Sequence, residues 1–409
     1  MSEIRPFNGV RYPANGAELA KLLAPPYDII TPAGREELLA RDPRNVVRLI
    51  LASSPDASAY EEAGKFLRDW VDEGALAADE TPSLYVLEQR FEAEGRRYER
   101  HGLLARFRAE DPERGIILPH EQTRKAPKED RIRMLRATRA NFSPIFLMVP
   151  DEAGGFMGRL EAIEKASPAV QYSDDEGVLH RLWVVTDPGE VSSLQELLRE
   201  PAAYIADGHH RHATALRRRD EVGPDAAWTL GFFTPMESPG LVVLPYHRIL
   251  SQGPSAEEAR QALGEKFEVR DVTGVADAAG GAGASKAPFA FGLAWPGGDA
   301  LVAEAKAEAV ELIPAGTPPS LEALDPFFFH RVVLERLFGI GDESVGYVHS
   351  LAEAEEAVAA GRCRLAGLMR PTPVRQIKDV SDARESMPAK STFFHPKLPS
   401  GLVIHPLVE

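Results

Sequence analysis

The sequence predicts an α/β protein of the α+β kind, with a mixed sheet as its core and helices around it. Short apolar runs typical of buried strands recur along the chain, between longer segments with the 3.6-residue period of amphipathic helices. Gly, Pro and Asp residues mark the turns between them. The 409 residues are 44% hydrophobic, which suits a globular protein with a sizeable core.

Charge and cysteine content exclude several functional classes. The net charge of -15, from 47 basic and 62 acidic residues, disfavours non-specific binding to nucleic acid or anionic membranes. The single cysteine, Cys363, excludes a disulfide framework and a cysteine-based zinc site. We see no signal peptide and no apolar run near the ~20 residues that span a bilayer. We therefore expect a cytoplasmic protein with a small-molecule substrate and no nucleic-acid or membrane partner; the oligomeric state stays open.

Residues 1–110 are expected to form an N-terminal α/β segment. The two prolines of Ala24-Pro25-Pro26-Tyr27-Asp28-Ile29-Ile30 favour a rigid, extended approach, and a capped helix follows Thr31-Pro32. The run 46–51 reads as a buried strand interrupted by Arg48, a charge that needs a carboxylate or a bound anion. A helix over 58–80 and paired strands over 84–91 and 97–107 complete the segment.

Residues 111–252 are expected to form a core segment, and its first connection is rich in polar groups. The candidate ligands in this connection are His120, Glu121, Thr123, Lys128 and Arg131. A solvated surface loop is the alternative, but a functional loop is also expected to be polar and to lie beside a rigid strand. The pattern then predicts a helix at 130–140, a strand at 142–149, a helix at 152–171, a strand at 179–185 and a helix at 191–200.

The stretch 203–216 holds the strongest candidate site. A short apolar strand ends at Asp207-Gly208, and an Ala-rich helix begins at His209. The unpaired backbone N–H groups and the positive dipole end of such a helix attract anions. His209, His210 and Arg211 add donors there, Gly208 permits close approach, and Asp207 could act as a base or hold a metal ion. The alternative is a capping Asp207 followed by exposed first-turn residues.

Two further strands, 228–234 and 241–250, close the core segment, and residues 253–409 are expected to form a C-terminal α/β segment that closes the cleft. We expect a helix at 255–267, a low-complexity linker or loop at 274–285, strands at 289–295 and 301–312, helices at 324–338 and 352–360, and a strand at 363–369. In the tail, the two cations and two hydroxyls of Lys390, Ser391, Thr392 and Lys397 suit phosphate oxygens. A solvated terminal loop is the alternative.

Four stretches together resemble one family. They are Ala24 to Ile30, His120-Glu121-Gln122-Thr123, Ala206-Asp207-Gly208-His209-His210-Arg211, and Met387-Pro388-Ala389-Lys390-Ser391-Thr392-Phe393-Phe394 with Pro396-Lys397. Over nearly its whole length the sequence is similar to the prokaryotic family called domain of unknown function 1015. Its central turn also resembles, over about a dozen residues, that of free serine kinases of the partition-protein/sulfiredoxin-like superfamily. His209 stands where sulfiredoxins have a catalytic cysteine, which argues against sulfinic-acid reduction.

This resemblance implies phosphoryl transfer to a small hydroxyl substrate, free L-serine first, with Mg²⁺ and with ATP, ADP or pyrophosphate as donor. Gly208, His209, His210 and Arg211 would hold the phosphates, with Arg131, Lys390 and Lys397 closing around them. Asp207 or Glu121 would accept the hydroxyl proton or hold Mg²⁺, and His209 and His210 join this catalytic set. A non-catalytic nucleotide- or anion-binding regulator is a second hypothesis, and a metal-dependent hydrolase using His209, His210, His120 and Asp207 a third. Because the candidates are scattered along the chain, we expect its segments to share one cleft.

Overall fold

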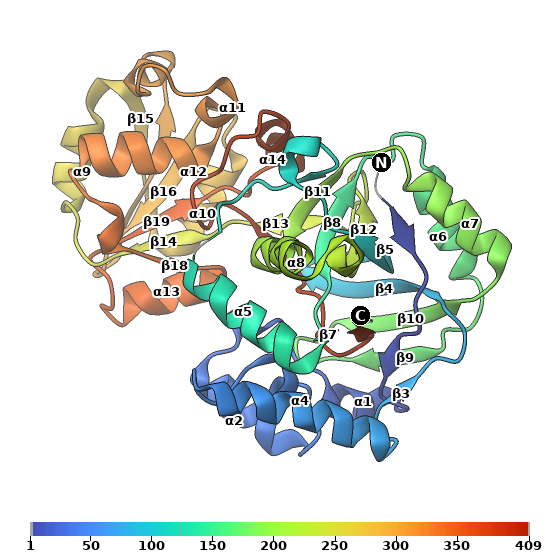
Figure 1. Cartoon of the computed structure of the whole chain (residues 1–409). Helices are drawn as coiled ribbons and strands as arrows, with labels where there is room; N and C mark the ends of the chain where they lie inside the picture. Colours follow the sequence, from blue (N-terminus) through green and yellow to red (C-terminus); the bar gives the residue numbers. More distant parts are fainter. Residues whose placement is uncertain (1–2, 124, 408–409) are drawn as a thin grey trace. The chain divides into compact units, whose positions relative to one another are not determined.

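A nine-stranded mixed sheet forms the centre of the larger of two compact units, in a computed structural model that describes residues 3–123 and 125–407 (Figure 1). The strand order is β6-β11-β8-β12-β5-β4-β10-β9, with β1 paired to β5. β11 runs parallel to β6 and β8 runs parallel to β12, and the other neighbours are antiparallel. The strands are β1 (Ile4–Arg5), β4 (Leu84–Ala93), β5 (Arg96–Arg108), β6 (Ile117–Leu118), β8 (Ile145–Val149), β9 (Val170–Ser173), β10 (Leu179–Val185), β11 (Ala203–Asp207) and β12 (Trp228–Pro235).

Helices cover this sheet and extend beyond it. Phe156 and Leu160 of α6 and Leu194 of α7 join the apolar core that the sheet residues form, while α8 packs against β8 and β12. The helices of this unit are α1 (Gly16–Leu22), α2 (Pro32–Arg41), α3 (Val47–Ile50), α4 (Ala57–Asp72), α5 (Lys125–Thr138), α6 (Gly155–Ile163), α7 (Pro188–Leu197) and α8 (His209–Val222), with 3-10 turns η1 (Tyr27–Ile29), η2 (Pro112–Arg114) and η3 (Pro224–Ala227). The unit also has two small strand pairs. In these, β2 (Val10–Arg11) pairs with β3 (Ala77–Ala78), and β7 (Ala140–Asn141) pairs with β21 (His405–Pro406).

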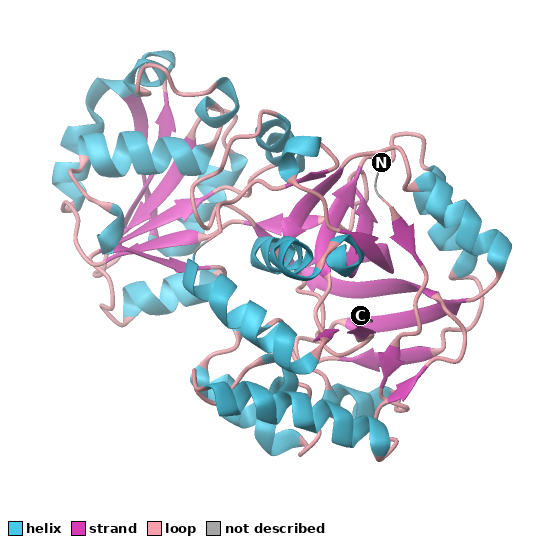
Figure 2. Cartoon of the chain, in the orientation of Figure 1, coloured by secondary structure: helices cyan, strands magenta, loops and turns pink. Residues whose placement is uncertain are grey.

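The second unit is built on a six-stranded antiparallel sheet of order β15-β17-β16-β19-β14-β18, visible as a separate set of magenta strands in Figure 2. Its strands are β14 (His247–Leu250), β15 (Phe267–Thr273), β16 (Ala290–Ala294), β17 (Asp299–Ala305), β18 (Val345–Val348) and β19 (Leu365–Met369), and β13 (Val242–Leu244) pairs separately with β20 (Phe393–His395). Its helices are α9 (Ala256–Leu263), α10 (Gly274–Ala284), α11 (Pro319–Glu322), α12 (Asp325–Phe328), α13 (Leu351–Ala359) and α14 (Val374–Asp382), with short turns η4 (Gly264–Lys266), η5 (Ala307–Leu312) and η7 (Asp342–Ser344) and a π-helical segment η6 (Phe329–Leu337). A mixed α/β architecture is thus confirmed.

The expected low-complexity linker at 274–285 is wrong, because this stretch forms helix α10. Val275, Ala278 and Ala282 are buried along one face of the helix. Its small residues allow a close approach to the sheet: a Cβ atom on Gly292 of β16 would lie 2.7 Å from the Ala278 carbonyl oxygen. The glycines and alanines therefore serve helix–sheet packing, and tertiary contacts outweigh the low helix propensity of glycine.

The expected strand at 46–51 is also wrong, because residues Val47–Ile50 form the single-turn helix α3. The Asn45 carboxamide sets this turn. Its Oδ1 accepts from Val47 N at 2.9 Å, and its Nδ2 donates to the carbonyls of Lys21 and Leu23. An apolar run of this length is compatible with either a strand or a buried helical turn, and the side-chain cap decides between them.

Smaller differences concern where elements end. The expected strand 241–250 is divided into β13 and β14 around Pro245, which has no N–H to donate to a ladder. The expected helix 152–171 ends at Ile163, and β9 begins within it. The expected strand 301–312 ends at Ala305, before η5. The paired strands predicted at 84–91 and 97–107 are confirmed as β4 and β5, and the turn between them has Glu94 and Gly95 at positive φ.

The two units are Met1–Pro119, Thr123–Val242 and Pro396–Glu409 for the first, and His120–Gln122 and Val243–His395 for the second. The first two segments expected from the sequence, 1–110 and 111–252, lie mainly in the first unit. The C-terminal tail returns to that unit at Pro396. Within the described part of the chain, no helix combines the length and apolar character that a bilayer crossing needs.

Candidate functional site

The predicted strand-turn-helix at 203–216 is confirmed. β11 ends at Asp207, Gly208 is the N-cap residue with φ 96°, and α8 begins at His209. The first intrahelical bond runs from His212 N to the Gly208 carbonyl at 3.0 Å, so the preceding N–H groups have no acceptor within the helix. A positive φ is accessible to glycine at little cost. The alternative prediction, in which Asp207 caps the helix, is wrong, because Gly208 occupies the N-cap position.

Two cations hold the Asp207 carboxylate, one from the next turn of the chain and one from the C-terminal tail. The Arg211 Nη2 atom lies 2.9 Å from Asp207 Oδ2, and the Lys397 Nζ atom lies 3.6 Å from Asp207 Oδ1. All three side chains are largely buried, with exposed fractions of 21% for Asp207, 12% for Arg211 and 11% for Lys397. Arg211 also donates to the Pro144 carbonyl. The turn is therefore a compact group of one carboxylate and two cations.

The electrostatics of the turn favour the ionised form of Asp207. Burial alone would raise the pKa of this carboxyl, but Lys397, Arg211 and His209 and the Gly208 N–H together hold it well below its usual range. A carboxylate that binds protons so weakly is a poor proton acceptor near neutral pH. Asp207 is better suited to orienting cations than to deprotonating a hydroxyl.

Lys397 reaches Asp207 because the tail is fixed to the sheet. Arg100 is fully buried, donates to the Pro396 carbonyl at 2.6 Å, and also bonds to Gln89 Oε1. Burial lowers the pKa of Arg100 to about 9, so the group stays charged at neutral pH. Gln89 Nε2 donates to the Lys397 carbonyl at 3.5 Å. Sequence reasoning missed Arg100, because it stands in the polar stretch 96–101, where nothing in the sequence sets it apart as buried.

Arg131, a predicted site residue, lies beside Tyr27. Its Cζ atom is 3.7 Å from the centroid of the Tyr27 ring, and its Nη1 donates to the Ile50 carbonyl at 2.7 Å. Burial raises the pKa of Tyr27 to about 12, and the charges of Arg131, Asp28, Arg211 and Asp207 act on the same phenol. Tyr27 and the turn are therefore close in space. Sequence reasoning had noted the Pro25-Pro26-Tyr27 stretch for its rigidity and for the family resemblance, and had not placed Tyr27 in the site.

A cavity of about 60 Å³, here called the first cavity, adjoins the turn. Its lining combines Arg131 and Arg211 with hydroxyl, amide and apolar side chains; the remaining lining residues are Tyr27, Ile50, Met134, Leu135, Ala140, Asn141, Phe142, Ser143, Thr214, Ala215 and Thr229. Two guanidinium groups among neutral hydroxyls suit an anion such as a carboxylate or phosphate. Asn141, Ser143 and Thr214 are donors that sequence reasoning did not single out.

Five further predicted ligands belong to the first unit. Thr123 and Lys128 are half-buried, and Lys128 belongs to α5. Arg48 of α3 has its guanidinium 5.6 Å from the Phe66 ring centroid. Within the described residues its Nε atom has no hydrogen-bond partner. His209 is 6% exposed and His210 half-buried at the start of α8.

The remaining predicted ligands, His120, Glu121, Lys390, Ser391 and Thr392, belong to the second unit. His120 Nε2 lies 3.1 Å from Thr392 Oγ1, and the His120 carbonyl accepts from Met387 N. Ser391 donates to the Pro388 carbonyl, and Lys390 Nζ lies 4.9 Å from the Tyr246 ring centroid. The His120 and Lys390–Thr392 stretches thus meet within the second unit. A single cleft that unites them with the turn stays a prediction.

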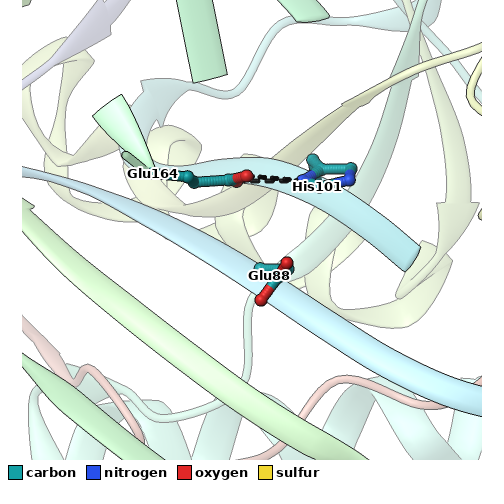
Figure 3. Close-up of side chains that lie close together, drawn as sticks. All are labelled: Glu88, His101 and Glu164. Carbon is teal, nitrogen blue, oxygen red and sulfur yellow. Dashed lines mark hydrogen bonds and ion pairs between the residues drawn. The ribbon is translucent and has the colours of Figure 1, made fainter. Parts of the chain in front are cut away.

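One group of side chains could hold a metal ion by its composition. Glu88, His101 and Glu164 place ligand atoms within 4.8 Å of one another in the described part of the chain. His101 Nδ1 lies 2.8 Å from Glu164 Oε2, and a dashed line marks this contact in Figure 3. Burial acts to lower the pKa of His101, but the hydrogen bond and charge of Glu164 act to raise it. The net shift of the pKa is upward. Because Arg181 and Arg90 already contact Glu88, we interpret the group as an ion-pair network. None of the residues of the hydrolase hypothesis belongs to it.

Three comparisons relate the chain to known proteins. A family model described as "Protein of unknown function (DUF1015)" matches residues 4–327. No curated protein matches. Among solved structures, a variant of a free serine kinase in complex with AMP is 14% identical at a TM-score of 0.35, over 69% of this chain and 87% of that chain. A conserved hypothetical protein from Pyrococcus furiosus is 14% identical (TM-score 0.34; 70% and 91%), and SbnI with a C-terminal truncation from Staphylococcus aureus is 10% identical (TM-score 0.35; 69% and 81%).

Proposed function

The chain belongs to the DUF1015 family of proteins of unknown function, and we propose that it is a phosphotransferase that phosphorylates a small hydroxyl substrate, with free L-serine and its product O-phosphoserine as the first candidates. The observation that carries the proposal is the Asp207 carboxylate held between Arg211 and Lys397 at the N-terminus of α8. The resemblance of this turn to that of free serine kinases suggests serine as the acceptor.

The turn has the parts that phosphoryl transfer needs. Phosphoryl transfer requires little covalent chemistry from the protein and depends on positioning and on cations around the transferred group. The N–H groups of the first turn of α8, with the helix dipole, would bind phosphate oxygens. Arg211 offers a planar fork and Lys397 a point charge for the same oxygens. Asp207 keeps both cations in place before the donor binds.

In the reaction, the hydroxyl oxygen of the acceptor forms a bond to the terminal phosphorus of the donor. The bond from that phosphorus to the bridging oxygen breaks, and the leaving group departs with the electron pair. The hydroxyl proton passes to a carboxylate. Asp207 is not this carboxylate, because its pKa is held too low for a good base.

The residues of the turn fit Mg²⁺ only together with the phosphates of a donor. Mg²⁺ takes oxygen ligands and keeps several waters, and it is usually held by one or two carboxylates plus phosphate oxygens. Asp207 offers one carboxylate, and both of its oxygens already contact cations. When bound, Mg²⁺ would neutralise charge on the transferring group, and Asp207 would be its protein ligand.

Phosphorus NMR of the full chain with Mg²⁺, L-serine and, in parallel, ATP, ADP or pyrophosphate tests the proposal. We expect a serine-dependent phosphomonoester signal with at least one donor. Arg211→Ala should abolish it, while Arg217→Ala, which removes a more exposed arginine of the same helix paired with Glu129 and Glu221, should retain it.

Other outcomes select the other hypotheses. Loss of donor without serine dependence points to hydrolysis or to a different acceptor. Broadened donor resonances without turnover would replace the kinase by a nucleotide- or anion-binding regulator.

A further inference from the structure

A second cavity, of about 130 Å³, lies in the same unit and shares Lys397 with the turn. Leu23, Pro25, Ile29, Tyr172 and Pro399 contribute its apolar lining, and Lys397 lies at the side nearest the turn. It has about twice the volume of the first cavity. The two cations that hold Asp207 thus open onto different cavities, Arg211 onto the first and Lys397 onto the second.

The segment 25–29 contributes to both cavities. Pro25 and Ile29 line the second cavity, while Tyr27 lines the first. Tyr27 to Ile29 form the 3-10 turn η1, in which successive side chains point in different directions. The rigid Pro25-Pro26 approach therefore fixes one wall of each cavity.

Tyr172, which lines the second cavity, has an unsatisfied polar atom. Tyr172 is 3% exposed, and within the described residues its hydroxyl has no hydrogen-bond partner. Its ring stacks on His180 with centroids 4.5 Å apart. A buried hydroxyl without a partner costs free energy. The Tyr172 ring supplies an aromatic wall to the cavity.

Carboxylates line the rim. Asp174 accepts from the backbone N–H groups of Glu176 and Val178 and from His180 Nε2 at 2.8 Å, and Asp175 pairs with Arg41. Ionised carboxylates have several acceptor sites and bind sugar hydroxyls and amino groups. They would repel the carboxylate of an amino acid. The charged lining residues of the first cavity are Arg131 and Arg211, whereas the second cavity combines carboxylates with the cations Arg41 and Lys397.

We propose that the second cavity binds the nucleoside of the phosphoryl donor, with its phosphates passing Lys397 to the turn, and that the first cavity takes the anionic acceptor. This assignment rests on the proposed function. An apolar cavity with a few polar groups suits a base and its sugar, whereas free serine has no apolar surface to bury there. The donor is therefore a nucleoside polyphosphate, and pyrophosphate alone leaves the second cavity empty.

Calorimetric titration of the full chain with ADP and, separately, with pyrophosphate tests this inference. Ala20→Phe would fill the second cavity from α1, and Ile29→Glu would add charge at a side chain that is 37% exposed and tolerant of change. We expect each variant to weaken ADP binding at least about 10-fold and to leave pyrophosphate binding within about 2-fold, since only ADP has a group to place there. Leu135→Trp, which fills the first cavity, is the matched control and should leave ADP binding unchanged.

The inference is overturned if ADP binds no better than pyrophosphate, if neither second-cavity variant affects ADP, or if Leu135→Trp weakens ADP equally. Thermal unfolding of each variant separates a folding defect from a binding defect. The proposed function can fail independently: ADP binding that depends on Ala20 and Ile29, with no phosphomonoester formed from any hydroxyl substrate, supports the cavity and rejects the kinase.

Discussion

The Nζ atom of Lys397 lies 3.6 Å from the Oδ1 atom of Asp207, and this contact joins the C-terminal tail to the end of β11. Arg211 occupies the other oxygen of the same carboxylate. A buried carboxylate between two cations is stable only while all three partners remain, because removing one leaves charges uncompensated. The same arrangement keeps two cations oriented at a helix N-terminus, where an anion would bind.

Replacing Asp207 by Asn tests this arrangement. The change leaves Arg211 and Lys397 without their shared anion, so pyrophosphate should bind about 3- to 10-fold more tightly, as expected when a nearby negative charge is removed. Turnover should fall about 100-fold, the usual effect of losing one oriented electrostatic group. Titration calorimetry and steady-state kinetics measure the two effects.

Asp220→Asn is the matched control, since Asp220 lies on the same helix in an exposed pair with Arg219. It should change neither quantity. If Asp207→Asn leaves turnover unchanged, Asp207 has no role in the mechanism.

Arg100 is expected to act on anion binding through the tail. Arg100→Met removes the donor to the Pro396 carbonyl and to Gln89, which should lower the free energy of unfolding by about 1–3 kcal/mol. Because the tail then loosens around Lys397, pyrophosphate affinity should fall as far as it does in Lys397→Met. Urea unfolding and calorimetry give the two values.

Arg106→Met on the same strand, where the guanidinium lies 5.2 Å from the Trp228 ring centroid, should leave pyrophosphate affinity unchanged. If Arg100→Met lowers stability but not affinity, Arg100 has only a structural role.

Buried histidines make the protein sensitive to mild acid. Burial lowers the pKa of His212 and His247 to about 4 and that of His405 to about 3. The unfolded chain takes up protons near pH 6.5 while the folded one does not, so stability is complete above about pH 6.5 and declines as pH falls toward these folded pKa values. Each such histidine contributes a slope of up to about 1.4 kcal/mol per pH unit in this window.

The free energy of unfolding at pH 7 and pH 5, measured in urea, checks this effect. His405→Gln should reduce the difference between the two pH values. His101 acts in the opposite direction, because Glu164 raises its pKa: its contribution is present below about pH 6.5 and is lost as pH rises through the folded pKa. A protein equally stable at pH 5 and pH 7 would contradict the prediction for the buried histidines.

Two glycine substitutions test the packing of α10. Gly292→Ala should destabilise the protein by about 1–3 kcal/mol, as overpacking does, because its Cβ would lie 2.7 Å from the Ala278 carbonyl oxygen. Gly283→Ala in α10 is the matched control, with no atom within 4 Å of its Cβ. It should stabilise the protein by about 0.5–1 kcal/mol through helix propensity. Thermal unfolding distinguishes the two, and equal effects would contradict helix α10.

Local patterns predicted much of the fold and the central part of the site. The period of the apolar residues predicted β10 at Leu179–Val185 and the strand, turn and helix around Asp207 and Gly208. Capping residues predicted α2 after Thr31, whose hydroxyl accepts from Gly34 N at 3.1 Å. These features depend on neighbours in sequence, so the sequence alone contains the information.

Contacts with residues distant in sequence decide the secondary structure of residues 46–51 and 274–285. An apolar run such as 46–51 suits a strand or a helical turn, and bonds from Asn45 to Lys21 and Leu23 select the turn. The Gly-Ala stretch 274–285 has low intrinsic helix preference, and packing on β16 makes it helical.

The amino-acid sequence by itself determined the family, the α/β class and the Asp207-Gly208 turn, because each is encoded by residues close together in the chain. Only the tertiary structure decided that Lys397 joins Arg211 at Asp207, that Arg100 fixes the tail, and that two cavities with different charged linings flank the turn. Such contacts join residues far apart in sequence, and a pattern of periods and spacings carries no information about which distant charges meet in the folded state.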